Sequence, residues 1–131
     1  MTTKQKTKIM MAKFGLDGHN NGMKIVTQWL RDAGFQVIFM GLYNTPEKII
    51  KAAVEEDVDI IGASFATGAH VFYVPRLIEQ IKKNKLDNVK LVVGGNISPD
   101  DIPWLKELGV KQVYTPGTTR DVIINSIEAL S

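Results

Sequence analysis

The sequence has 131 residues, of which 44% are hydrophobic and 23% charged, and its formal net charge is +2 at pH 7. This size and composition are typical of one globular domain with its own core, and they exclude a disordered or membrane chain. Lysines are scattered apart from Lys82, Lys83 and Lys85, so a nucleic-acid partner is not expected. The absence of cysteine excludes disulfides and thiolate metal sites.

The N-terminal residues are polar and basic, without the apolar segment of a signal peptide. No apolar run approaches the roughly 20 residues that span a bilayer. We therefore expect a cytoplasmic protein with no membrane partner. Its organisation is expected to be a flexible segment over 1–8 and a single domain over 9–131.

The first predicted strand, 9–12, is followed by an amphipathic helix over 22–33, which Gly34 ends. The next strand, 37–40, leads to a second helix that extends to about Glu56. Thr45 is expected to be its N-cap, and Pro46 its first residue. The side chains expected to face inward are Val26, Trp29, Leu30 and Ala33 of the first helix and Ile49, Ile50, Ala53 and Val54 of the second.

Three further strands are predicted over 60–64, 91–93 and 112–114. A third helix is expected near 73–83. Ser98 and Pro99 begin a fourth helix that Gly109 ends, and the last helix covers 119–130. Five strands thus alternate strictly with five helices.

This alternation predicts an α/β, flavodoxin-like (Rossmann-like) fold, in which a doubly wound, five-stranded parallel sheet has helices on both faces. The expected strand order is 2-1-3-4-5. Ligands of such sheets bind beyond the carboxyl ends of the strands, where the strand order reverses. Here that crevice lies between the first and third strands.

Four polar, glycine-rich segments follow strands at this edge of the sheet. They are Lys13 to Gly22, Ser64 to His70, Gly94 to Asn96, and Tyr114 to Thr118. The first contains an Asp-x-His pair, Asp17 and His19. A carboxylate that accepts one imidazole N–H fixes the tautomer and raises the basicity of the other nitrogen toward a metal.

Zinc is a poor fit, because two histidines without cysteine do not readily supply three or four ligands. Cobalt in a corrin fits better, since the macrocycle provides four equatorial nitrogens and the protein adds one axial ligand. His70 is expected at a helix entry or on the surface, without a chemical role.

The separated motifs resemble the signature of cobalamin-binding domains over essentially the whole chain after Lys8. Asp17-x-His19-x-x-Gly22, Ser64 and Gly94-Gly95 are similar to the family's D-x-H-x-x-G, S-x-L and G-G motifs. The wider strings are most similar to those of the methylmalonyl-CoA mutase branch. These strings are Ala12-Lys13, Leu16-Asp17-Gly18-His19, Gly68-Ala69-His70, Val93-Gly94-Gly95 and Tyr114-Thr115-Pro116-Gly117-Thr118.

The resemblance implies adenosylcobalamin as cofactor, with His19 displacing the cofactor's own base as the lower ligand of cobalt. Asp17 would orient His19, and Lys13 would lie near this pair. The nucleotide tail of the cofactor would enter a slot lined by the loops at the sheet edge. The residues expected to contact the cofactor are Gly18, His19, Asn20, Gly22, Ser64, Phe65, Ala66, Gly94, Gly95, Tyr114, Thr115, Pro116 and Gly117.

Two positions depart from the family pattern. Asn20-Asn21 replaces the usual Asp-Arg of the acyl-CoA mutases, and Ala66 replaces the leucine of S-x-L. Cobalt ligation does not depend on these residues. Contacts of the Asp-Arg pair and the shape of the tail slot are expected to differ.

The function implied is the small subunit of an adenosylcobalamin-dependent acyl-CoA mutase, a radical isomerase that is inactive without its large substrate-binding subunit. A GTPase repair chaperone is a second candidate partner. The main alternative is a corrinoid carrier of a methyltransferase system, and a glutamate-mutase-type small subunit also has a suitable length. A receiver domain is disfavoured because Ala12, Lys13, Ala63 and Ser64 stand where it needs acidic residues. A dinucleotide site is disfavoured by the spacing of the glycines.

Overall fold

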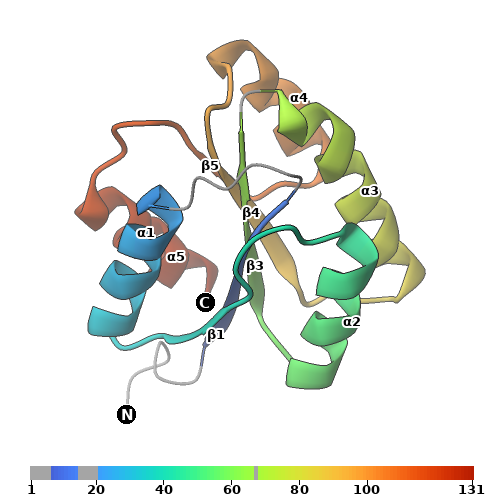
Figure 1. The fold of residues 1–131 in the computed structure, drawn as a ribbon, viewed down its shortest axis with the longest axis horizontal. Coiled ribbons are helices and arrows are strands. Elements are labelled where there is room, and N and C mark those ends of the chain that lie inside the picture. Colours follow the sequence, from blue (N-terminus) through green and yellow to red (C-terminus); the bar gives the residue numbers. More distant parts are fainter. Residues whose placement is uncertain (1–6, 15–20, 67) are drawn as a thin grey trace.

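A computed structural model describes residues 7–14, 21–66 and 68–131 of the chain (Figure 1). The strands are β1 (Lys8–Lys13), β2 (Gln36–Phe39), β3 (Ile60–Phe65), β4 (Lys90–Gly95) and β5 (Gln112–Tyr114). The α-helices are α1 (Asn21–Asp32), α2 (Pro46–Glu56), α3 (Ala69–Lys83), α4 (Ile102–Leu108) and α5 (Arg120–Leu130). A short 3-10 helix, η2 (Pro99–Asp101), leads into α4.

The five strands form one parallel sheet in the order β2-β1-β3-β4-β5, which confirms the predicted topology. Because β1 lies between β2 and β3, the chain reverses its direction of winding at this point. The carboxyl ends of β1 and β3 are therefore adjacent at the edge where a ligand is expected.

Helices cover both faces of the sheet, with α1 and α5 on one side and α2, α3 and α4 on the other (Figure 1). Successive residues of a strand point to opposite faces, so each strand contributes to two cores. Met10 and Ile61 belong to the larger core, under α2, α3 and α4. Ile9 and Ile60 belong to the smaller core, under α1 and α5.

The predicted N-cap of α2 is confirmed, and α5 begins with a similar cap. The Thr45 hydroxyl accepts a hydrogen bond from the Lys48 amide at 3.3 Å, and Thr119 accepts one from the Val122 amide at 3.4 Å. The prediction that Val54 faces inward is wrong, since its side chain is 51% exposed. The inward stripe of α2 is narrower than the run of apolar residues suggested.

Helix α3 begins at Ala69, four residues before its predicted start at Tyr73, and therefore contains Pro75 in its interior. Proline lacks an N–H and pushes aside the carbonyls of the preceding turn. The Arg76 guanidinium donates a hydrogen bond to the Phe72 carbonyl at 2.6 Å, which supplies a donor where the helix is weakened. The helix therefore continues through the proline, with this side-chain hydrogen bond in the turn that Pro75 weakens.

His70 lies at the entry of α3, as expected, but it is buried rather than on the surface. Its side chain is 2% exposed, and its Nε2 lies 2.7 Å from an Asp101 carboxylate oxygen. This contact joins the start of α3 to η2. In the part of the chain that the structure describes, no helix is long and apolar enough to cross a membrane.

Candidate functional site

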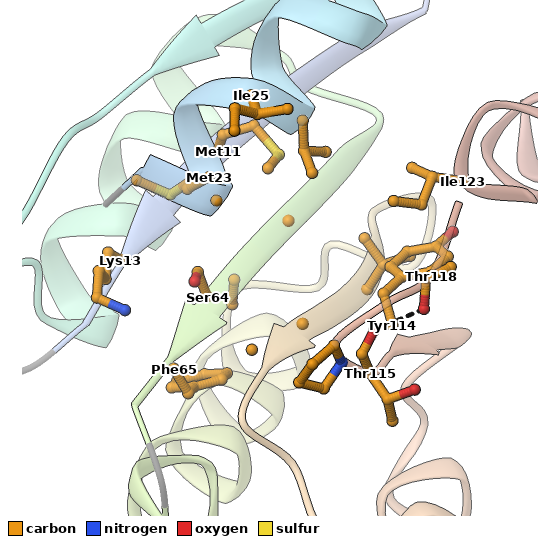
Figure 2. Close-up of a pocket in the computed structure, with 18 of the residues that line it drawn as sticks. Met11, Lys13, Met23, Ile25, Ser64, Phe65, Tyr114, Thr115, Thr118 and Ile123 are labelled. Atoms are coloured by element: carbon orange, nitrogen blue, oxygen red, sulfur yellow. Dashed lines mark hydrogen bonds between the residues drawn. The ribbon is translucent and has the colours of Figure 1, made fainter. Parts of the chain in front are cut away.

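A cleft of about 680 Å³ opens at the carboxyl ends of the strands, on the face of the sheet that α1 and α5 cover. Figure 2 shows side chains of β1 and α1 on one side of it and side chains of β5 and α5 on the other. The strand β3 runs between them and carries Ser64. The cleft therefore lies at the predicted switch point, between the two helices of one face.

The register of the sheet explains which side chains reach the cleft. Lys13 is paired with Ser64, Ser64 with Gly94, and Gly94 with Tyr114, so these four residues form one row across β1, β3, β4 and β5. All four line the cleft. Two small residues at the centre of the row leave the sheet surface open between the larger side chains at its ends.

The walls of the cleft are mainly apolar. The apolar side chains that line it include Ile9, Met11, Met23, Val26, Trp29, Leu30, Val92, Ile123 and Ile127. Polar groups gather at the carboxyl edge of the strands, from Lys13, Ser64, Asn96, Thr115 and Thr118. The site can thus hold an aromatic or aliphatic group against the sheet while binding polar groups near the opening.

Lys13 is a buried lysine on this edge, with a side chain that is 4% exposed. Its amino group is turned toward the side of the cleft where Ser64 lies (Figure 2). Burial of an ammonium group is costly unless polar groups surround it. A cation at this position favours polar or anionic partners at the mouth of the cleft.

Tyr114 closes the row on the opposite side and is tied to α5. Its hydroxyl is hydrogen-bonded to the Ser126 hydroxyl, which itself donates to the Ile123 carbonyl at 3.0 Å. Because the Ile123 carbonyl only accepts, Tyr114 donates to Ser126. Burial raises the pKa of the Tyr114 hydroxyl above its usual value, against the opposing effect of this hydrogen bond. The phenol therefore stays neutral and holds α5 at a fixed distance from the sheet.

The double glycine after β4 combines two different requirements. Gly95 has a φ of +113°, and a Cβ there would lie 2.1 Å from the Phe65 carbonyl oxygen. Only glycine allows this close approach of two backbones. A Cβ on Gly94 would meet the Tyr114 carbonyl oxygen at 3.4 Å, an ordinary contact. Gly95 thus serves the fold, whereas Gly94 keeps the floor of the cleft low.

We predict that Gly95→Ala lowers the free energy of unfolding by about 3 kcal/mol, from left-handed backbone strain together with overpacking. Gly94→Ala should change it by less than about 1 kcal/mol, because a glycine-to-alanine change is tolerated where the backbone allows it. Urea unfolding of both variants measures this. Equal losses in the two variants would contradict the division of roles.

Phe65 lines the edge of the cleft, but its ring belongs to the opposite face of the sheet. It is stacked on Phe14 with a centroid distance of 5.6 Å and on Tyr73 at 6.2 Å. This arrangement follows from strand alternation, because Ser64 points into the cleft and its neighbour points away. Phe65 supports the site from behind instead of presenting its ring to a ligand.

All of the predicted site residues that the structure describes are gathered here. Those that line the cleft are Lys13, Gly22, Ser64, Phe65, Ala66, Gly94, Gly95, Tyr114, Thr115, Pro116 and Gly117. Asp17, Gly18, His19 and Asn20 lie outside the described residues. The apolar walls from α1 and α5 were not predicted. The small residues on this face of the sheet, Gly62 and Ser64 of β3 and Gly94 of β4, were a signal for the open floor of the cleft but not for its walls.

A family model described as the B12 binding domain matches residues 7–124. The chain belongs to the B12-binding domain family. In the described ranges of this B12-binding chain, no three side chains of His, Cys, Asp or Glu lie close enough together to hold a metal ion.

Similar curated proteins include the small subunit of 2-hydroxyisobutanoyl-CoA mutase from Aquincola tertiaricarbonis, 36% identical over 94% of this chain and 90% of that protein. The small subunit of pivalyl-CoA mutase from Xanthobacter autotrophicus is 38% identical over 94% of this chain and 82% of that protein. The B12-binding chain is thus homologous to small subunits of acyl-CoA mutases along most of their length.

Among solved structures, the monomethylamine corrinoid protein of Methanosarcina barkeri is similar, with a TM-score of 0.81 and 20% sequence identity. The match covers 98% of this chain and 61% of that protein. At this level of identity the likeness concerns the fold alone. It confirms that the flavodoxin-like architecture predicted from the strand and helix pattern is one used by corrinoid proteins.

Proposed function

We propose that this chain is the cobalamin-binding small subunit of an adenosylcobalamin-dependent acyl-CoA mutase, with His19 as the lower axial ligand of cobalt. The observation that carries the proposal is the cleft at the carboxyl edge. The row formed by Ser64, Gly94 and their neighbours across the sheet lines this cleft. The cleft lies beside the end of β1, from which the chain continues to Asp17 and His19. The relatives named as mutase small subunits supply the reaction class.

The cleft fits the nucleotide tail of cobalamin in size and chemistry. A volume of about 680 Å³ is within the usual range for small-molecule sites, and its apolar walls suit a benzimidazole ring. A Cβ on Gly22 or Gly117 would meet no atom within 4 Å, so space remains open along two edges of the cleft. The Ser64 hydroxyl lies where it could donate to a ring nitrogen.

The bound cofactor supplies the radical chemistry of the isomerisation. The chain's own residues would hold and orient it: His19 ligates the metal, and Asp17 accepts the second imidazole N–H. Lys13 and Ser64 offer polar contacts at the opening, and Tyr114 fixes the wall formed by α5. This chain therefore controls the position and electronic environment of cobalt, not the substrate.

The substrate would be bound by a large partner subunit, because the described sheet resembles no barrel, a fold that typically takes about 250 residues. We also assign this chain to the cytoplasm and regard a GTPase repair chaperone as a further partner.

Identifying the protein that co-purifies with the tagged chain tests the partnership with a large subunit. Recovery of a mutase large subunit is expected, and recovery of a corrinoid methyltransferase would support the carrier function instead.

We predict that Asp17→Asn weakens cobalamin affinity or turnover about 10- to 100-fold, the usual effect of losing a carboxylate that orients a metal-bound histidine. The free energy of unfolding should change little, because asparagine has nearly the same size and shape as aspartate. Absorption titration with hydroxocobalamin and a urea unfolding curve measure both quantities. Affinity and turnover equal to those of the wild type would refute this role for Asp17.

A further inference from the structure

Asn44 is a buried polar residue at the carboxyl edge that the proposed function does not yet use. It follows β2 and is 2% exposed. Its backbone forms a parallel bridge with Phe14, and its amide donates to the Lys13 carbonyl at 3.2 Å. Asn44 therefore lies against the exit of β1, although 31 residues separate it from Lys13.

The side chain of Asn44 strengthens the same junction. Its Nδ2 donates to the Lys13 carbonyl at 3.0 Å and to the Gly41 carbonyl at 3.0 Å. The Gly41 carbonyl also accepts the Lys13 amide at 3.0 Å. One side-chain amide thus joins the ends of two neighbouring strands, and both of its acceptors are main-chain carbonyls that any substitution leaves in place.

These contacts also fix the orientation of the amide. Carbonyl oxygens only accept hydrogen bonds, so the nitrogen must face Lys13 and Gly41. The other atom, Oδ1, is buried and has no donor among the residues described. An apolar side chain would avoid the cost of this unsatisfied oxygen. What asparagine adds at this position is the pair of donated hydrogen bonds that brace the exit of β1.

The braced segment is the one that leads to the proposed cobalt ligand. Phe14 is held between Asn44 on one side and the Ser64 carbonyl on the other, which accepts the Phe14 amide at 3.4 Å. His19 follows Phe14 by only five residues in the sequence. A metal ligand must be held within about 0.5 Å of its productive position, so movement at the root of a short segment affects ligation directly.

We propose that Asn44 is a positioning residue for the cobalt ligand: its side-chain amide fixes the exit of β1 and thereby sets where His19 meets the cofactor. This inference rests on the proposed function. It goes beyond it by assigning a role in cofactor binding to a residue that is separated from the Asp17–His19 pair in sequence and does not line the cleft.

The test is Asn44→Ala in the 131-residue chain, with hydroxocobalamin as the probe. Loss of the brace should weaken binding by about tenfold, the lower end of the range for residues that orient metal ligands. The nitrogen hyperfine splitting from the protein ligand should also weaken in the electron paramagnetic resonance spectrum of the cob(II)alamin form. Asn44→Ser keeps one hydroxyl donor and should lie between alanine and the wild type, which preserves the test if the alanine variant does not fold.

Thr45→Ala is the matched control. It removes the N-cap of α2 at the adjacent position, where the side chain hydrogen-bonds to Lys48. A loss of stability is expected, with cobalamin affinity within twofold of the wild type. Asn44 variants that bind and ligate like the wild type, or a Thr45→Ala variant that loses as much affinity, would overturn the inference. If the wild-type chain itself failed to bind cobalamin through a histidine, the proposed function would fall with it.

Discussion

Mixed with a mutase large subunit and adenosylcobalamin, the chain should isomerise a branched acyl-CoA ester, whereas either subunit alone should give no detectable product. The cleft in the described residues suits a cofactor tail and lies at an open edge of the sheet. Radical intermediates must be shielded from water, so a second protein has to cover this edge. Turnover of the complex should reach the ordinary enzymatic range, about 1 to 1000 per second.

The measurement is chromatographic separation of acyl-CoA isomers after incubation with a panel of short and branched esters. As a control, the His19→Ala chain mixed with the same large subunit shows whether isomerisation requires cobalt ligation. If no large subunit gave isomerisation, and the chain instead accepted and donated methyl groups with methyltransferases, the carrier function would replace the one proposed here.

Replacing His19 by alanine should remove the imidazole signature from the absorption spectrum of the bound cobalamin and weaken binding by about 100-fold or more. This estimate takes the upper end of the losses caused by residues that only orient a ligand, since His19 would be the ligand itself. Titration of the purified variant with hydroxocobalamin measures both effects.

His70 provides a matched control, because the chain contains only two histidines. It is buried and contacts Asp101, so His70→Asn should lower stability. The imidazole signature of the bound cobalamin should nevertheless remain. A variant pair with the opposite behaviour, in which His19→Ala keeps the signature and His70→Asn loses it, would show that the ligand has been misassigned.

The sequence predicts the order and type of the elements because each apolar strand is short and each helix carries its own start or stop signal, such as Thr45-Pro46 or Gly109. It does not predict where α3 begins. The helix was expected from about Tyr73, whereas it begins at Ala69 and continues through Pro75, next to which Arg76 donates a hydrogen bond to the Phe72 carbonyl. Val54 was placed inward by its spacing, whereas the packing of α2 on the sheet leaves it exposed.

The sequence predicts the site residues at the carboxyl edge of the sheet better than the apolar residues of the cleft walls. Lys13, Ser64, Gly94 and Tyr114 could be assigned to one edge from the sequence, because each ends or directly follows a predicted strand. Their alignment in a single row depends on the register of four strands, which the sequence pattern does not specify. An apolar helix face has the same sequence pattern whether it packs against a sheet or lines a cleft. Only the structure therefore shows that α1 and α5 form walls of the cleft.

The central claim, ligation of cobalt by His19, is tested most directly by electron paramagnetic resonance of the cob(II)alamin form bound to chain labelled with nitrogen-15 only in histidine. The axial nitrogen splits the cobalt lines, and the multiplicity of that splitting depends on the nuclear spin of the nitrogen. We predict that histidine labelling changes the multiplicity in the wild type and in His70→Asn, and that the splitting from the protein is lost in His19→Ala. A multiplicity unchanged by the label would mean that the axial nitrogen does not belong to a histidine, which would contradict the account.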